Sequence, residues 1–280
     1  DRLVHACCVD AARLSGAKLR VFRHNDLDEL DRILRWASGL PRNDAGGPRV
    51  LVVTEGVFSM DGDSAPLAGL VELKERHGAW LMLDEAHGTG VLGPEGRGLA
   101  AALGLGERIE VRMGTLGKAL GASGGFIAGS RALIDLLVNR ARSFIFSTAP
   151  VPAAAAAATA ALELMITRDG EDARQRLRSV AADGARVVTR AFPKPAGSAA
   201  SEGSVGHILP VHVGDEAAAV ALADRLRAAG VWVPAIRHPT VARGSARLRL
   251  TFSAAHTEAD LHSLEQALNR ASIQNPATPF

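Results

Sequence analysis

The chain has 280 residues, 47% of them hydrophobic and 22% charged, so it can bury a substantial core and has room for two domains. Its 32 basic and 30 acidic residues leave a formal net charge of +2, without the positive excess of a nucleic-acid-binding surface. The longest apolar stretch, Ala153 to Ile166, carries Glu163 and is shorter than the roughly 20 residues that span a bilayer. We therefore expect no nucleic-acid or membrane partner, and a buried or interface helix at this stretch.

The cysteine content and the start of the chain bear on its compartment. Cys7 and Cys8 are the only cysteines, and neighbouring cysteines rarely form a disulfide without strain. The first residues carry no secretory signal pattern, so a cytoplasmic location is predicted. The chain begins at Asp1 without an initiator methionine, and we expect it to lack an N-terminal part.

Short β-rich runs alternate with helical runs from Arg49 onward, which predicts an α/β fold with a mostly parallel sheet. Asp169 and Gly170 interrupt the helical pattern, so we place a domain boundary there, between a large domain at 1–168 and a smaller α+β domain at 169–280. The large domain is predicted to contain strands at 50–53, 79–83, 109–113 and 126–128, and helices at 66–77, 131–142 and 153–166. The small domain is predicted to contain helices at 171–189, 216–229 and 257–271, strands at 207–213, 231–236 and 247–252, and an exposed connection at 193–206.

Two segments at predicted strand ends could carry chemistry. The strand at 79–83 ends in Asp84, and His87 follows on the same loop, where open α/β sheets bind their ligands. Taken alone, such an acid is more often a helix cap or a loop residue. Lys118 lies among glycines after the strand at 109–113, and small neighbours leave space beside it for a bulky group. From this segment alone, an exposed lysine in a loop is an equal alternative.

Pyridoxal 5′-phosphate (PLP) chemistry joins these two segments. The cofactor needs a lysine to hold it and a carboxylate to keep its pyridine nitrogen protonated. Lys118 and Asp84, at the ends of different strands, can supply both groups. His87 could donate to the phenolic oxygen of the ring.

Other charged segments have simpler interpretations. The loop at 55–63 contains Asp61 and Asp63, but it lacks the spacing of a calcium loop, so no metal site is predicted. Arg247 and Arg249 alternate with apolar residues on a strand, which favours a solvated face. Arg237 precedes a proline-containing turn, where its guanidinium could hold a substrate carboxylate, although a surface arginine is the more common case.

Parts of the sequence also fit two functions of other classes. The sequence Asp84-Glu85-Ala86-His87 also occurs as a box in ATP-driven helicases. A phosphate-binding loop of the required spacing is absent, because Ala119 follows Lys118 and the lysine comes after the acidic box. A non-catalytic fragment that only dimerises stays open as an alternative.

Together these motifs resemble the α-oxoamine synthases, PLP-dependent acyltransferases with the aspartate-aminotransferase fold (fold type I). The resemblance covers nearly the whole chain and is carried by segments 54–63, 84–90, 114–121 and 235–241. It implies a decarboxylative condensation of L-alanine with a pimeloyl thioester of coenzyme A or a carrier protein, in biotin biosynthesis. The glycine-using branch, represented by 2-amino-3-ketobutyrate ligase (glycine C-acetyltransferase), is the alternative that segment 114–121 also resembles.

The resemblance also implies roles for individual residues and a homodimer. Lys118 would hold the cofactor and act as the base, Asp84 would face the pyridine nitrogen, and His5 would stack on the ring. The remaining assignments are His87 to the phenolic oxygen, Thr115 to the phosphate, Ser59 to the cofactor's surroundings, Thr148 to the partner subunit's phosphate, and Arg237 to the alanine carboxylate. Relatives carry a phosphate-binding turn and acyl-binding residues ahead of Asp1, so we expect this chain to bind the cofactor weakly or not at all.

Overall fold

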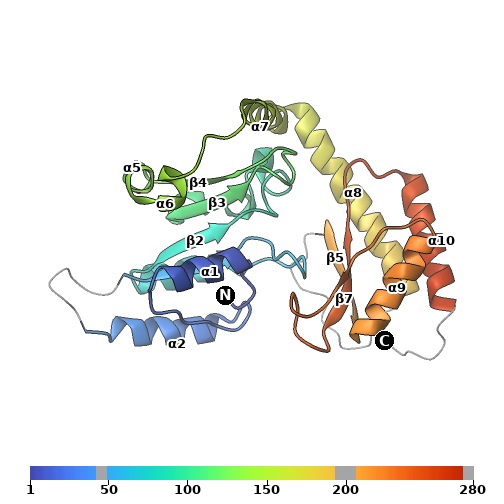
Figure 1. Cartoon of the computed structure of the whole chain (residues 1–280), viewed down its shortest axis with the longest axis horizontal. Coiled ribbons are helices and arrows are strands. Elements are labelled where there is room, and N and C mark those ends of the chain that lie inside the picture. Colours follow the sequence, from blue (N-terminus) through green and yellow to red (C-terminus); the bar gives the residue numbers. More distant parts are fainter. Residues whose placement is uncertain (42–48, 193–205, 274–280) are drawn as a thin grey trace. The chain divides into compact units, whose positions relative to one another are not determined.

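A computed structural model describes residues 1–41, 49–192 and 206–273. Contacts divide the chain into two compact units. The first contains Asp1–Phe58 and Ser64–Glu171, and the second contains Ser59–Asp63 and Asp172–Phe280. The second unit thus includes a short segment from the loop after the first strand, which the predicted ranges 1–168 and 169–280 assign to the large domain. Figure 1 shows the elements along the chain.

The first unit is built on a four-stranded mixed sheet. Its strands are β1 (Leu51–Glu55), β2 (Trp80–Asp84), β3 (Val111–Thr115) and β4 (Gly125–Gly129). They lie in the order β1-β2-β3-β4, with β1, β2 and β3 parallel and β4 antiparallel to β3. The predicted α/β class with a mostly parallel sheet is therefore confirmed.

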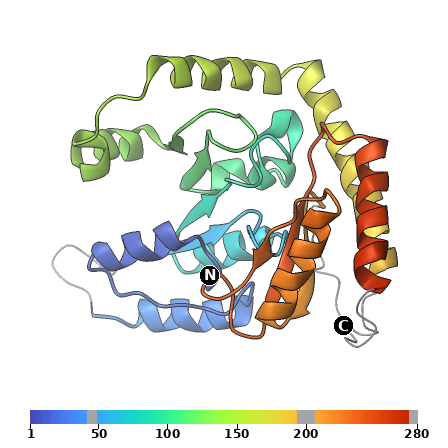
Figure 2. The same cartoon turned by 45° about the vertical axis from the view of Figure 1, so that its right-hand side comes forward.

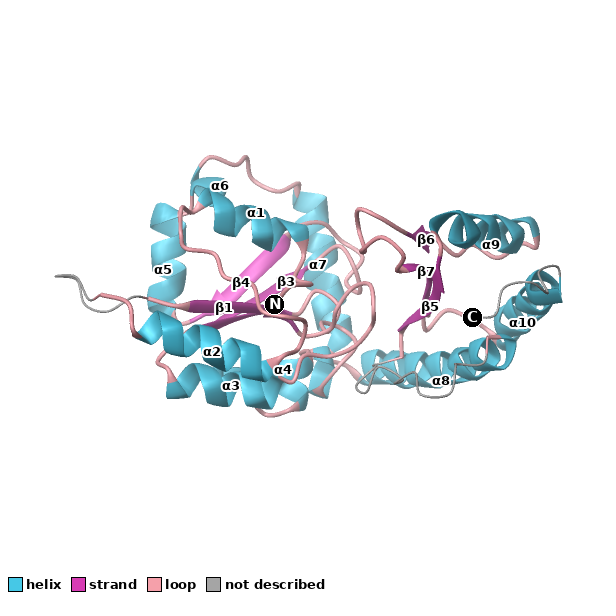
Figure 3. Cartoon of the chain, turned by 90° about the horizontal axis from the view of Figure 1, so that it is seen from below, coloured by secondary structure: helices cyan, strands magenta, loops and turns pink. Residues whose placement is uncertain are grey.

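Helices cover both faces of this sheet (Figure 3). Figure 3 shows α2, α3 and α4 on one face and α1 and α6 on the other. The α-helices of the first unit are α1 (Ala6–Leu14), α2 (Leu27–Ser38), α3 (Leu67–Arg76), α4 (Leu99–Ala102), α5 (Arg131–Arg140), α6 (Arg142–Ile145) and α7 (Pro152–Met165), with 3-10 turns at Pro94–Gly96 and Gly106–Arg108. The core lies mainly between the sheet and α2 and α3, where Leu34, Leu70 and Leu81 are at most 1% exposed.

Four of these helices, α1, α2, α4 and α6, are not among the predicted elements. The Asp26 side chain caps α2 by accepting a hydrogen bond from the Glu29 N–H at 2.8 Å. Leu30 and Leu34, four residues apart, then place their side chains on one buried face. The cap and this spacing are the signals that identify α2.

The second unit is a three-stranded antiparallel sheet with helices beside it. Its strands are β5 (Ile208–Gly214), β6 (Ala235–Ile236) and β7 (Ala246–Thr251), in the order β5-β7-β6. The helices are α8 (Arg168–Ala191), α9 (Glu216–Ala228) and α10 (Glu258–Ile273), drawn from yellow to red in Figure 2. Leu226 of α9 and Leu248 of β7 are fully buried in the core that joins sheet and helices.

Several element predictions are wrong in detail. β6 has two residues rather than the six predicted, because the Val231 N–H donates to Leu226 O at the end of α9 instead of pairing with a strand. Gly170 lies inside α8 rather than at a break, and a Cβ there would come within 2.5 Å of Met165 O. Most of the predicted connection at 193–206 lies outside the described residues.

The predicted solvated face at Arg247 and Arg249 is also wrong. Arg247 is 6% exposed and forms an ion pair with Asp61. The Arg249 Nε–H donates to Ser59 O at 2.5 Å, and burial lowers the pKa of its guanidinium. The partners lie 186 and 190 residues away in sequence, so no local pattern could predict them.

The Ala-rich helix α7 is largely exposed, with only Ala158 buried, so the buried alternative does not hold within this chain. Of the helices in the described part of the chain, none is both long and apolar enough to cross a bilayer.

Candidate active site

The carboxyl ends of β1, β2 and β3 meet at one edge of the sheet in the first unit. Glu55 pairs in register with Asp84, and Asp84 pairs with Met113. Because three parallel strands end here, the loops that follow them converge at this edge. The segments that carry Asp84, His87 and Lys118 are therefore neighbours in space.

Lys118 lies in the loop after β3, and its side chain is exposed. Its Nζ is 3.0 Å from Nε2 of His87, which is half-buried in the loop after β2. The surrounding glycines leave space, since a Cβ at Gly121 would meet nothing within 4 Å and one at Gly117 nothing within 3.5 Å. The amine of Lys118 therefore faces an imidazole and has room for a larger group beside it.

Asp84 ends β2 and is 4% exposed. Its Oδ1 accepts a hydrogen bond from the Ala86 N–H at 2.8 Å. Burial raises the pKa of this carboxyl group, and the Ala86 hydrogen bond and the charges of Lys118 and His5 oppose that rise. A cationic group placed against Asp84 would stabilise its ionised form.

His5 precedes α1 and caps it, because Nδ1 of its ring accepts a hydrogen bond from the Cys7 N–H at 3.3 Å. The same nitrogen is 3.0 Å from Cys7 Sγ. Burial raises the pKa of the next thiol, that of Cys8, to about 12, so Cys8 stays protonated at neutral pH. The electrostatic effect of His5 on Asp84 places it in the same neighbourhood as the strand ends.

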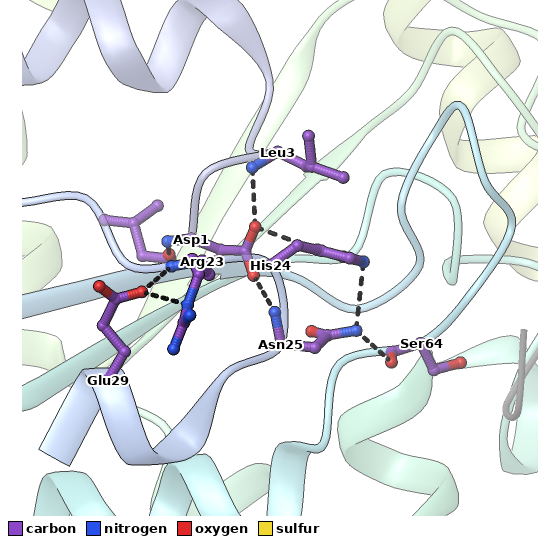
Figure 4. Close-up of polar contacts among 8 residues, drawn as sticks. Asp1, Leu3, Arg23, His24, Asn25, Glu29 and Ser64 are labelled. Carbon is purple, nitrogen blue, oxygen red and sulfur yellow. Dashed lines mark hydrogen bonds and ion pairs between the residues drawn. The ribbon is translucent and has the colours of Figure 1, made fainter. Parts of the chain in front are cut away.

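The segment before His5 is held by a polar cluster that the sequence analysis missed (Figure 4). The Asp1 carboxylate accepts hydrogen bonds from the backbone N–H groups of Leu3 at 2.7 Å and Asn25 at 2.8 Å. Asn25 in turn donates from its side chain to Ser64 O at 3.2 Å. The cluster therefore links the segment that precedes His5 with the turn before α2 and with the loop after β1.

The predicted phosphate ligands lie in different surroundings. Thr115 ends β3, and its hydroxyl donates to Gly124 O and accepts from the Gly117 N–H, both at 3.2 Å. It therefore shapes the loop that carries Lys118. Thr148 is exposed between α6 and α7, in a segment where Phe144 and Phe146 are 63% and 71% exposed.

Ser59 and Arg237 belong to the second unit. Ser59 accepts the hydrogen bond from Arg249 through its carbonyl oxygen. Arg237 follows β6 directly, is exposed, and lines a pocket with Glu216 and Asp224 of α9. The first unit brings Asp84, His87 and Lys118 to one edge of its sheet, and the roles predicted for all of these residues stay predictions.

Glu85 is a buried residue that the sequence analysis did not single out. It is 4% exposed, and each of its carboxylate oxygens accepts a backbone hydrogen bond. The signal for it was a second acid directly after Asp84 at a strand end. Within the residues that the structure describes, no group of three or more His, Cys, Asp or Glu side chains could hold a metal ion.

The fold and the strand-end site define an α/β protein whose basic and acidic groups gather at the carboxyl edge of a mostly parallel sheet. Residues 1–268 match the model of the family described as aminotransferase class I and II. The chain belongs to that family, and the resemblance inferred from its motifs is confirmed.

Among curated proteins, the chain is similar to enzymes named 8-amino-7-oxononanoate synthase. It is 46% identical to the one from Burkholderia thailandensis over 96% of this chain and 64% of the relative. It is 49% identical to the one from Anaeromyxobacter dehalogenans over 100% of this chain and 66% of the relative. The chain thus spans slightly less than two thirds of the length of these relatives.

Among solved structures, the chain is similar to a variant of serine palmitoyltransferase from S. paucimobilis described with a bound PLP–myriocin aldimine. The TM-score is 0.87 at 30% identity, over 96% of this chain and 65% of that chain. The likeness extends through both units described above.

Proposed function

We propose that the protein is a PLP-dependent acyltransferase that condenses L-alanine with a pimeloyl thioester. The products are 8-amino-7-oxononanoate, carbon dioxide and the free thiol of coenzyme A or of a carrier protein, in biotin biosynthesis. The observation that carries the proposal is the approach of Lys118 Nζ to His87 Nε2 beside the buried carboxylate of Asp84. The names of the curated relatives support the same reaction.

The residues at the strand ends fit PLP. Lys118 offers an amine with open space around it, and Asp84 offers a carboxylate that is 4% exposed and whose pKa is raised by burial. When bound, the cofactor supplies an electron-withdrawing ring that stabilises a carbanion at the α-carbon of an amino acid. Lys118, Asp84 and His87 would hold it, Thr115, Ser59 and Thr148 would serve its phosphate or its surroundings, and His5 would lie against its ring.

Each of the side chains at the site then has its own role in the proposed reaction. The Lys118 amine removes and returns the proton at the α-carbon of alanine, which requires it to be neutral during that step. The carboxylate of Asp84 keeps a proton on the ring nitrogen. Arg237 would hold the alanine carboxylate, which leaves as carbon dioxide after the new carbon–carbon bond has formed and the thiol has departed.

A homodimer in the cytoplasm, without nucleic-acid or membrane partners, completes the proposal. Large apolar side chains around Thr148 support it, because Phe144, Phe146 and Val151 are 63%, 71% and 67% exposed. A second subunit would cover such a surface.

Borohydride reduction in the presence of PLP, followed by peptide mapping, tests the proposal. We expect the label on Lys118 in the wild-type protein and in the control Lys18→Ala, whose lysine is also exposed. A label confined to another lysine would contradict the proposed site.

The α-proton exchange of L-alanine compared with that of glycine tests the amino-acid substrate. We expect faster exchange with L-alanine. A strong preference for glycine would instead support glycine C-acetyltransferase.

A further inference from the structure

The proposed mechanism gives no role to Glu85, although this residue is as buried as Asp84. Its Oε2 accepts a hydrogen bond from the Leu99 N–H at 3.0 Å, and its Oε1 accepts one from the Ala100 N–H at 2.8 Å. Leu99 and Ala100 are the first residues of the four-residue helix α4. Burial raises the pKa of the Glu85 carboxyl group, and the hydrogen bonds from the Ala100 and Leu99 N–H groups, which favour the ionised form, oppose that rise.

Three chain segments close around this carboxylate. A Cβ at Gly56, after β1, would lie 2.7 Å from Oε2, and one at Gly88, after β2, would lie 2.1 Å from it. A Cβ at Gly98, before α4, would lie 2.5 Å from the carboxyl carbon. Glycine backbone at three positions is therefore in direct contact with Glu85, and the side chain joins the loop after β1 to both ends of the segment between β2 and α4.

The backbone of Glu85 shapes the loop that carries His87. Its N–H donates to Met113 O at 2.7 Å, which continues the pairing of β2 with β3. Its carbonyl oxygen accepts from the Gly88 and Thr89 N–H groups at 3.0 and 2.8 Å. His87 lies inside this turn, with Nε2 at 3.0 Å from Lys118 Nζ, so a shift of the turn would move the imidazole away from the amine.

A second contact couples the same loop to the lysine loop. A Cβ at Gly90 would lie 2.5 Å from Cβ of Ala119, the residue after Lys118. The two loops therefore touch at His87 with Lys118 and at Gly90 with Ala119. Glu85 fixes the first of these loops to α4 through its hydrogen bonds with the Leu99 and Ala100 N–H groups.

We propose that Glu85 is a positioning residue, whose carboxylate joins α4 to the loop after β2 and thereby holds His87 against the amine of Lys118. This inference rests on the proposed function, because its effect is observed through PLP bound at Lys118. Glu85 does not touch the cofactor or the substrate and acts only through His87.

Glu85→Gln is the sharpest variant, because it keeps the shape of the side chain but replaces one acceptor oxygen with an amide donor that faces a backbone N–H. The matched control is Glu110→Gln. Glu110 is a carboxylate in the same unit that also accepts a backbone hydrogen bond, from the Leu81 N–H at 2.8 Å, and pairs with Lys74 at 2.6 Å. It lies just before β3, at the opposite edge of the sheet from Lys118.

The readouts are the pH titration of the visible absorbance of the PLP-loaded protein, and kcat and KM for L-alanine. For Glu85→Gln we expect the titration midpoint to move by at least about 0.5 unit, because His87 leaves the amine. We expect kcat to fall about tenfold while KM stays within about twofold, the pattern of a lost supporting contact. Glu110→Gln should lower thermal stability without moving the titration or kcat.

A folded, PLP-loaded Glu85→Gln protein with the wild-type titration and kcat would overturn the inference. If Glu85→Gln does not accumulate as folded protein, Glu85→Asp takes its place, since it keeps two acceptor oxygens but shortens the side chain. The Lys118 label of the wild-type protein is measured first. A label confined to another lysine would overturn the proposed function, whereas a label on Lys118 together with unchanged variants would overturn only the role of Glu85.

Discussion

The loops that follow β1 and β2 make an instructive comparison. Both leave the carboxyl end of a parallel strand, and both are rich in glycine and in acids. After β1, Asp61 pairs with Arg247, and the neighbouring Gly62 lies so close to Ile208 that a Cβ would be 2.2 Å from its carbonyl oxygen. The charge in this loop is used to build the second unit.

After β2, the acids have a different environment. The side chain of Asp84 accepts a hydrogen bond from the Ala86 N–H, and burial raises the pKa of its carboxyl group. Nε2 of His87 lies 3.0 Å from Nζ of Lys118. Asp61 after β1 thus serves packing, whereas Asp84 and His87 at the end of β2 are available for chemistry, and the partner of each residue decides which. Substitutions in the loop after β1 should therefore lower stability, whereas substitutions at Asp84 and Lys118 should lower activity.

The largest effect is expected from Lys118→Ala. Removal of the amine that we propose holds the cofactor and moves the α-proton should lower kcat by about 10²–10⁴-fold. Thermal stability should hardly change, because the side chain is exposed. The measurements are steady-state product formation and thermal unfolding. Retention of a tenth or more of the wild-type activity would show that the loop after β2 faces a lysine without a catalytic role.

Asp84→Asn should separate activity from stability. Loss of the carboxylate charge that we propose faces the ring nitrogen of the cofactor should lower kcat roughly 10–100-fold, the equivalent of one charge-assisted hydrogen bond. The pKa of Asp84 is raised in the folded protein, so the folded state holds a proton that the unfolded state releases. The wild-type protein without cofactor therefore loses stability as pH rises from the ordinary aspartate value through the raised one. Above this window Asp84→Asn should be the more stable protein.

Thermal unfolding of both proteins without PLP, from about pH 3 to pH 8, checks the sign of this effect. The two curves should coincide below the ordinary pKa of aspartate and separate above it. A lower melting temperature for Asp84→Asn at neutral pH would place Asp84 with Asp61, as a residue whose ionised form stabilises the fold.

Strand-end chemistry was predictable from the sequence because it depends on local order. A parallel strand, its last residue and the loop behind it are contiguous, which is why Asp84, His87 and Lys118 could be expected to meet. Arg247 could not be assigned in this way, since its partner Asp61 comes from the loop after β1. The predicted break at Gly170 is wrong for a related reason, because this glycine allows close packing against the end of α7 and does not form a turn.

Asp61→Asn should affect stability instead of chemistry. Arg247 is 6% exposed, and the substitution would leave its charge buried without its ion pair. We expect a loss of about 2–3 kcal/mol in the free energy of unfolding, measured by urea titration. The double variant Asp61→Asn, Arg247→Met should recover more than half of that loss, because it removes the buried charge as well. Additive losses in the double variant would mean that the pair is not coupled.

The smallest effect is expected for an ion pair that belongs to neither loop. In α5, Nε of Arg131 lies 2.8 Å from Oδ1 of Asp135, and the two side chains are 89% and 55% exposed. Arg131→Gln should change the free energy of unfolding by less than about 0.5 kcal/mol, and added salt should remove the difference, because water and ions already screen the pair. The same urea titration measures it. Arg131→Gln and Asp61→Asn each break one arginine–aspartate pair, so the difference between their losses of unfolding free energy isolates the contribution of burial at Arg247. Equal losses would contradict the structural role given to the loop after β1.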